Sequence, residues 1–102
     1  MEISYSQNGN LVKILIQGNI DTRGGEKLTD TLNIVMKLDN IKHVIFDLTT
    51  VITTTSSGIG KLLRFYKYID SIGGIMEIKG ISDNLFTQFQ EIHLERIFPI
   101  SK

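Results

Sequence analysis

Five consecutive hydroxyl side chains followed by two glycines form the stretch of this sequence best suited to chemistry. The stretch is TTTSSGIG, residues 53–60, and it lies between an apolar run and an amphipathic segment. Capping a helix takes only one hydroxyl, and two glycines in a first helical turn cost about 1 kcal/mol each relative to alanine. The free N–H groups and partial positive charge of a helix start favour a nearby anion. The stretch is therefore suited to a phosphate carried on a serine, with plain helix capping as the alternative.

The side chains that could support catalysis lack the spacing that catalysis needs. Neither serine of the stretch has a glycine two residues before it, so there is no nucleophile elbow. The segment GGEK at 24–27 lacks the spacing of a phosphate loop, and neither His43 nor His93 has a second ligand at metal-binding distance in the sequence. Asp47 is interpreted as a hydrogen-bond acceptor at the end of a strand. We expect a binding module that is not an enzyme and that holds no cofactor or metal.

Composition excludes several other classes of protein. The chain has 102 residues, 41% of them hydrophobic and 22% charged, which predicts a single domain over residues 1–102. Its net charge is zero and its basic residues are scattered, so nucleic acid is not expected as a partner. The absence of cysteine suits a reducing compartment, and no apolar run approaches the roughly 20 residues that span a bilayer. We expect a cytoplasmic protein without membrane insertion.

The elements that must position the hydroxyl stretch alternate along the chain. Two strand-like runs, MEISYS and LVKILIQG, flank the turn residues 7–10, whose Asn-Gly pair is typical of a β-hairpin. Helical spacing follows at 26–38, and a nearly continuous apolar strand at 43–48 is expected to be covered on both faces. The second helix is expected to end at Gly73-Gly74, and a strand at 74–80 follows it. Ser82 then caps a third helix, which carries Leu85, Phe89 and Ile92.

The helix after the hydroxyl stretch has two distinct sides. Its apolar stripe is expected to pack on the sheet and comprises Ile59, Leu62, Leu63, Tyr66 and Ile69. Lys61, Arg64 and Tyr68 share the other side, which is a candidate docking surface or an ordinary solvated face. If the helix starts at about Ser57, Ser56 lies at or next to the N-cap, while Ser57 points into the first turn.

Four segments together resemble the STAS domains of anti-sigma factor antagonists. They are Gly18-Asn19-Ile20-Asp21, the strand at 43–48, the SSGIG run at 56–60 and Gly73-Gly74, and the resemblance covers essentially the whole chain. It implies the α/β, SpoIIAA-like STAS fold, with a mixed sheet of four to five strands opened by a β-hairpin. Three or more helices would cover that sheet.

The resemblance also implies a function. In this family a partner of GHKL type, which is both serine kinase and anti-sigma factor, phosphorylates the first serine of the motif. The unphosphorylated antagonist binds that partner and frees the sigma factor, and a PP2C-like phosphatase restores the binding form. Carried over by position, the phosphorylated residue is Ser56, with Ser57 as the alternative. The implied partner-binding residues are Asp21, Thr22, Thr55, Ser57, Gly58, Gly60, Lys61, Arg64 and Tyr68.

Thr55 departs from the family pattern, which has aspartate immediately before the phosphorylated serine. Threonine supplies no negative charge and is a weaker hydrogen-bond acceptor. The departure leaves three variants open: a kinase with other preferences, modification of a neighbouring hydroxyl among Thr53–Thr55, or an unphosphorylated STAS scaffold in a signalling or transport assembly. A nucleotide or small-molecule site at the same helix start is a further alternative.

Overall fold

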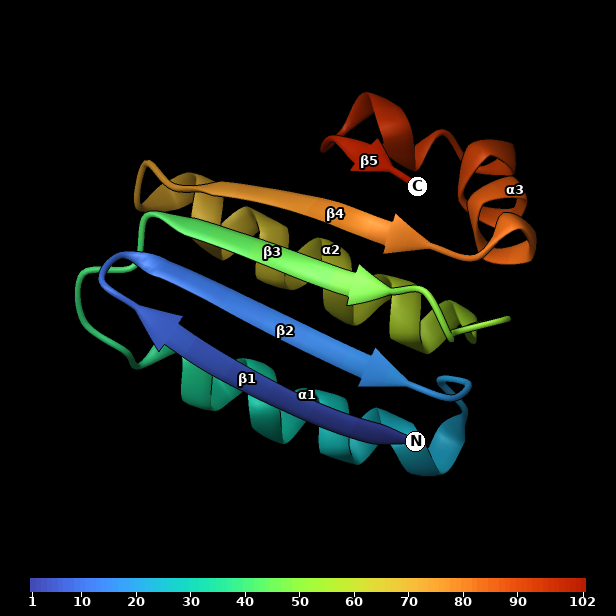
Figure 1. The fold of residues 1–102 in the computed structure, drawn as a ribbon, viewed down its shortest axis with the longest axis horizontal. Helices are drawn as coiled ribbons and strands as arrows, with labels where there is room; N and C mark the ends of the chain where they lie inside the picture. The colour runs from blue at the N-terminus through green and yellow to red at the C-terminus, as the bar shows by residue number, and fades with distance from the viewer.

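The computed structural model describes the backbone of residues 1–102 and every side chain except those of Thr22 and Arg23. The chain folds into one five-stranded sheet with helices that pack on it (Figure 1). In chain order the elements are β1 (Glu2–Asn8), β2 (Leu11–Gln17), α1 (Thr22–Met36), β3 (His43–Leu48), α2 (Ser56–Ser71), β4 (Ile75–Ile81), α3 (Asp83–Glu91), the 3-10 helix η1 (Leu94–Arg96) and β5 (Ile100–Ser101).

The strands lie in the order in which they occur in the chain. β1 pairs with β2 in antiparallel register, and β2 to β5 run parallel to one another. The hairpin turns between Asn8 and Leu11, which pair directly, and Gly9 takes a φ of 63° that favours glycine. Both the predicted hairpin and the predicted mixed α/β sheet are confirmed. The fifth strand, which the sequence left unplaced, follows Pro99, whose carbonyl accepts the N–H of Ile78 at 2.9 Å.

Helices α1 and α2 lie against the same face of the sheet (Figure 1). That face carries the core, so inward-pointing strand residues such as Val44, Phe46 and Ile78 are almost completely buried. On β3 the alternate residues, His43 and Ile45 among them, are only half-buried. The expectation that β3 is covered on both faces is therefore wrong, because no helix packs over its second face.

Helix α2 is fixed to the sheet by an aromatic contact. Phe65 is 1% exposed, and its ring meets that of Phe46 on β3 edge-on, with 5.8 Å between centroids and 86° between planes. The predicted stripe omitted Phe65. It included Leu62 and Ile69, which are fully buried, whereas its other members, Ile59, Leu63 and Tyr66, are half-buried. The buried side of α2 is thus rotated by part of a turn from the predicted one.

Helix α1 begins four residues earlier than predicted, at Thr22 instead of Glu26. Asp21 is its N-cap, and the carboxylate Oδ1 of Asp21 accepts the N–H of Gly24 at 2.8 Å. The Gly24-Gly25 pair, which precedes the predicted start, lies in the first turn of α1.

The third helix follows its predicted cap. Ser82 Oγ accepts the N–H of Leu85 at 3.2 Å, and both Leu85 and Phe89 are buried. Ile92, which was expected to lie on this helix, is its C-cap and is 46% exposed. In the part of the chain that the structure describes, no helix has the length and apolarity to cross a bilayer.

Candidate functional site

The loops that precede α1 and α2 are joined by a short parallel bridge. The N–H of Ile20 donates to the carbonyl of Thr53 at 3.2 Å, and the N–H of Thr55 donates to the carbonyl of Ile20 at 3.1 Å. This pairing places Asp21, the N-cap of α1, close to Thr55, the N-cap of α2. Two helix starts therefore lie side by side at the ends of parallel strands, the usual place for a site in an α/β sheet.

The hydroxyl stretch is also tied to its neighbours by side chains. The carboxamide oxygen of Asn19 accepts the N–H of Thr53 at 3.3 Å and that of the preceding residue at 3.1 Å. From the other side, Nε2 of Gln88 on α3 donates to the carbonyl of Thr54 at 3.0 Å. The hydroxyl stretch is therefore held in place by hydrogen bonds from both sides and is not a flexible linker. No local pattern predicts the role of Gln88, because only the tertiary fold brings α3 to this loop.

Thr55 caps α2, and Ser56 is the first residue of the helix. The Thr55 hydroxyl accepts the N–H of Gly58 at 3.1 Å. Ser56 was expected to lie at the N-cap or next to it; it lies next to the N-cap, which is Thr55. Ser56 is exposed, so its hydroxyl can be reached from solvent.

The sequence predicted that Ser57 points into the first turn of the helix, and this prediction is wrong. Ser57 is exposed, and its Oγ accepts a hydrogen bond from Lys61 Nζ at 3.1 Å. Lys61 lies across the start of α1, where a Cβ built on Gly25 would be 3.0 Å from Nζ. Gly25 thus leaves room for the lysine, a role that appears only once the two helices are packed.

A groove of about 360 Å³ lies between the first turns of α1 and α2. We call it the helix-start groove; it is lined by Asp21, Gly25, Glu26, Thr29, Asp30, Thr55, Ser57 and Lys61. Among the side chains that the structure describes, its charged groups are the carboxylates of Asp21, Glu26 and Asp30 and the ammonium of Lys61, and Asp21 also takes part in a further interaction. Such a surplus of negative charge repels a nucleotide or another anionic ligand and attracts a basic side chain. The alternative of a nucleotide site is therefore disfavoured.

The predicted docking side of α2 is only partly free. Arg64 is exposed and lies at the junction of α1 and α2. Tyr68 is half-buried, and its hydroxyl donates to the carbonyl of Met36 at 2.8 Å. The expectation that Tyr68 lies on a free surface is wrong, because its ring bridges the two helices. Lys61 and Arg64 remain as the cations of this side.

The two glycines of the motif serve different purposes. Gly58 is buried, and a Cβ there would collide with the Thr54 hydroxyl and would lie 2.9 Å from Cγ2 of Ile20. Gly60 has open space where a Cβ would be, so its backbone can be approached closely. Gly60 therefore fits a contact surface, whereas Gly58 shapes the loop from within. The Thr22 side chain, also predicted to bind a partner, lies outside the described residues.

The remaining polar candidates have structural partners. Asp47 Oδ1 accepts both the N–H and the hydroxyl of Thr49, at 3.0 and 2.6 Å, as expected of a strand-end acceptor. Nε2 of His43 lies 2.6 Å from Oε2 of Glu77. Burial raises the pKa of Glu77, but the His43 hydrogen bond and the charge of Lys79 outweigh it, so this pKa lies below its ordinary value. Among the described side chains, no three metal-binding groups come together.

Replacing Thr55 by alanine is expected to lower the free energy of unfolding by about 1 kcal/mol, because the N–H of Gly58 loses its acceptor. Thr55→Asp, which introduces the family residue, should be at least as stable as the wild type, since aspartate caps well and its charge suits a helix start. Urea unfolding of the three proteins measures both effects. Equal stability of the alanine variant and the wild type would show that Thr55 is not the effective cap.

Solved structures of similar fold include anti-sigma factor antagonists and a sulfate transporter family protein. The chain matches a STAS domain protein from Planctomyces limnophilus with a TM-score of 0.85 at 20% identity, covering 98% of this chain and 88% of that one. It matches phosphorylated SpoIIAA, a Bacillus cell fate determinant, with a TM-score of 0.76 at 16% identity, covering 99% and 92%. A sulfate transporter family protein from Wolinella succinogenes gives 0.73 at 18% identity, covering 86% and 70%.

These identities are low, so the likenesses establish the fold alone. The family follows from the sequence model of the STAS domain, which matches residues 2–102. The hairpin, the parallel strands and the paired helix starts described above are the structural form of that match. The chain belongs to the STAS domain family.

Proposed function

We propose that this protein is an anti-sigma factor antagonist, a binding module switched by phosphorylation of Ser56 and without catalytic activity of its own. The observation that carries the proposal is the position of Ser56, which is exposed at the first residue of α2, between Thr55 and Ser57 of the helix-start groove. A serine presented there can enter a kinase active site while the rest of the loop stays pinned. The match to SpoIIAA in its phosphorylated form supports the proposal by analogy of fold.

The switch would act by charge and bulk and would not need refolding. A phosphate adds about −1.5 to −2 charge and three acceptor oxygens. At the first residue of α2 it would be stabilised by the helix start, so the free phosphoprotein stays folded. In a complex, the same group would have to be desolvated against a surface shaped for a serine hydroxyl. Phosphorylation would therefore release the partner by weakening the complex, without destabilising the free protein.

The groove suggests what the partner presents. The carboxylates of Glu26 and Asp30 suit an arginine or lysine side chain, inserted next to Ser57. The proposed partner is a serine kinase and anti-sigma factor of GHKL type with such a basic residue, and a PP2C-like phosphatase would reverse the modification. Both encounters would take place in the cytoplasm, as the cysteine-free sequence suggested.

A second candidate is a STAS scaffold that is never phosphorylated. It is favoured by Thr55, which performs the capping that the family aspartate would perform and leaves the motif without that charge. The fold likeness to a sulfate transporter family protein shows that the same fold occurs in a different setting. In this reading the hydroxyl stretch would be a structural joint between α1 and α2.

The deciding experiment compares Ser56→Ala, Ser56→Asp and the matched control Ser57→Ala. Each is incubated with ATP and a GHKL-type kinase from the same organism, and the phosphorylated residue is located by mass spectrometry. We expect phosphate on Ser56 in the wild type and in Ser57→Ala, and none in Ser56→Ala. In calorimetric binding, Ser56→Asp and the phosphoprotein should bind the kinase at least about tenfold more weakly than the wild type.

Two outcomes would contradict the proposal. Phosphate on Ser57 alone would move the switch by one residue, to the side chain held by Lys61. Unmodified protein, combined with equal affinities for all variants, would leave the scaffold as the better reading. Thermal unfolding of each variant checks that a lost interaction does not reflect a lost fold.

A further inference from the structure

The second face of the sheet carries no helix. In Figure 1 this face is turned toward the viewer, with α1 and α2 behind it. Its apolar side chains are partly open to solvent: Leu15 on β2 is 37% exposed and Ile75 on β4 is 56% exposed, with Ile45 half-buried between them. Parallel strands are normally covered on both faces. The face therefore has the composition of a surface that another protein covers.

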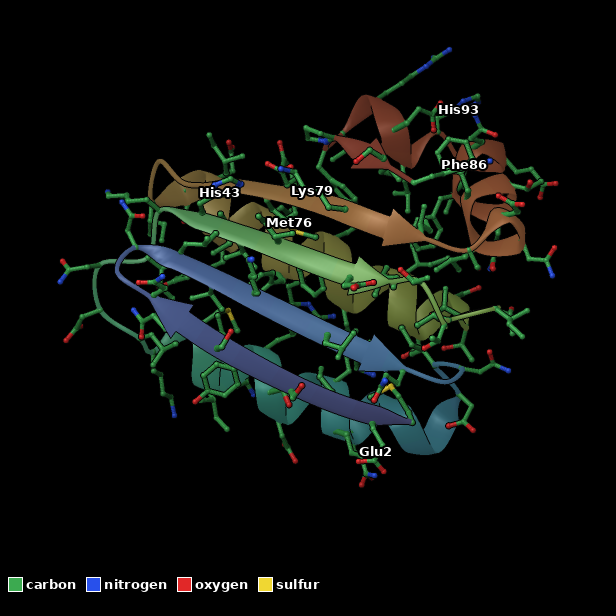
Figure 2. The ribbon with its side chains drawn as sticks, in the orientation of Figure 1. Glu2, His43, Met76, Lys79, Phe86 and His93 are labelled. Carbon is green, nitrogen blue, oxygen red and sulfur yellow. The ribbon has the colours of Figure 1, made fainter. Side chains whose placement is uncertain are left out.

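One row across this face combines both signs of charge around an apolar centre. Lys13 on β2 pairs in register with Ile45 on β3, and Ile45 pairs in register with Glu77 on β4. Glu77 is held by His43 and Lys79, two further residues of the face that Figure 2 labels. Among the described side chains, Lys13 has no ion-pair or hydrogen-bond partner. The row thus has an unpaired cation at one end and, at the other, a carboxylate that already contacts His43 and Lys79.

We propose that this face binds a second copy of the same chain, in a two-fold symmetric dimer whose axis runs parallel to β3. Rotation about that axis keeps the strand direction and exchanges the positions of β2 and β4. Lys13 of one copy then lies opposite Glu77 of the other, twice in the dimer, and Ile45 meets Ile45. The surface is complementary to itself, as a closed two-fold interface requires.

The charges distinguish this axis from the other two-fold arrangement of stacked sheets. An axis in the plane of the sheet but perpendicular to the strands would place β2 on β2 and β4 on β4, so that Lys13 would oppose Lys13 and Glu77 would oppose Glu77. Stacked sheets cross at about −30°, a rotation small enough to keep the central row in contact. The other carboxylate of the face, Asp47, is already hydrogen-bonded to Thr49.

The size of the face predicts a weak dimer. Strands of six residues at ordinary spacing give a patch of roughly 20 by 15 Å. Each copy therefore contributes a footprint of roughly 300 Å² and the two together roughly 600 Å², below the roughly 1,200 Å² at which specific, stable interfaces begin. A hollow of about 490 Å³ beside Lys13 and Leu15 would admit side chains of the second copy. Because the face lies opposite α1 and α2, dimerisation would leave the helix-start groove free.

Sedimentation equilibrium of the full chain from about 10 μM to 1 mM tests the proposal. We expect the wild type to dimerise in this range, more strongly at low salt, because salt screens the attraction between Lys13 of one copy and Glu77 of the other. Lys13→Glu alone and Glu77→Lys alone should each weaken dimerisation about tenfold or more, since each variant opposes like charges twice. A wild type that stays monomeric up to the highest concentration would overturn the proposal.

Two recombinations separate the proposed axis from other causes. A mixture of the Lys13→Glu and Glu77→Lys variants should form heterodimers, because every facing pair is then of opposite sign. The double variant Lys13→Glu/Glu77→Lys should dimerise with itself about as well as the wild type. Failure of the double variant to recover, in a protein that circular dichroism shows to be folded, would reject the axis parallel to β3 and so the proposed dimer.

Discussion

Replacing Phe65 by alanine is expected to lower the free energy of unfolding by about 3–5 kcal/mol, the largest effect we predict for a single substitution in this chain. Phe65 is almost fully buried between α2 and the sheet, and the edge-on contact with Phe46 is lost with the ring. Domains of this size are stable by only about 5–15 kcal/mol, so the variant should be close to unfolding at 37 °C. Urea denaturation followed by circular dichroism measures the change.

A suitable control removes a similar apolar group from the surface. Ile34 on α1 is 48% exposed, and Ile34→Ala should change the free energy of unfolding by less than about 0.5 kcal/mol. Comparable losses in both variants would mean that helix composition, and not the contact of α2 with β3, sets the stability. A loss below about 1 kcal/mol for Phe65→Ala would show that the core collapses easily into the vacated space.

Gly58→Ala is expected to destabilise the protein by about 1–3 kcal/mol, although alanine is the better helix former. The added methyl group would collide with the Thr54 hydroxyl and would press on the side chain of Ile20. Both belong to the bridge between the loops, which can yield only by separating the two helix starts. The variant should therefore also bind the proposed partner more weakly than its stability alone would explain.

Gly60→Ala provides the matched control, two residues further along the same helix. No described atom outside the local helix lies within 4 Å of the added Cβ, so only the gain in helix propensity remains. Thermal and urea unfolding should show this variant to be more stable than the wild type by up to about 1 kcal/mol. If both alanine variants shift stability in the same direction, close packing around Gly58 is not what requires glycine there.

Local signals in the sequence were sufficient for much of the fold. Gly9 marked the hairpin, because it lies between the paired Asn8 and Leu11 and takes a positive φ that glycine adopts most readily. Ser82 marked the start of α3 because capping is a local interaction: its hydroxyl accepts an N–H of the first helical turn and does not depend on how the helix packs. The parallel order of the later strands followed from the alternation of strands and helices.

The rotation of α2 could not be found in the same way. Its buried side runs through Gly58, Leu62, Phe65 and Ile69, and the glycine at its start carries no side chain to mark that side. Because Ile59 and Leu63 are apolar too, the sequence admits two overlapping stripes. Only packing against Phe46 selects between them.

The candidate site shows the same division. The resemblance singled out Asp21 and Thr55, and the bridge between Ile20 and Thr54 places these two residues close together. The half-buried state of Tyr68 depends on the distance between α1 and α2, which no local pattern encodes. The acidic character of the groove likewise comes from Glu26 and Asp30, which face α2 only after packing.

The bridge between Ile20 and Thr54 also constrains how related sequences can diverge. Because each loop is hydrogen-bonded to the other, a residue inserted or deleted in one would put donors opposite donors, and the second loop could not compensate. Side-chain identity can drift, as the exchange of aspartate for Thr55 illustrates, but loop length cannot. In this part of the domain, substitutions are tolerated, whereas insertions and deletions in either loop are not.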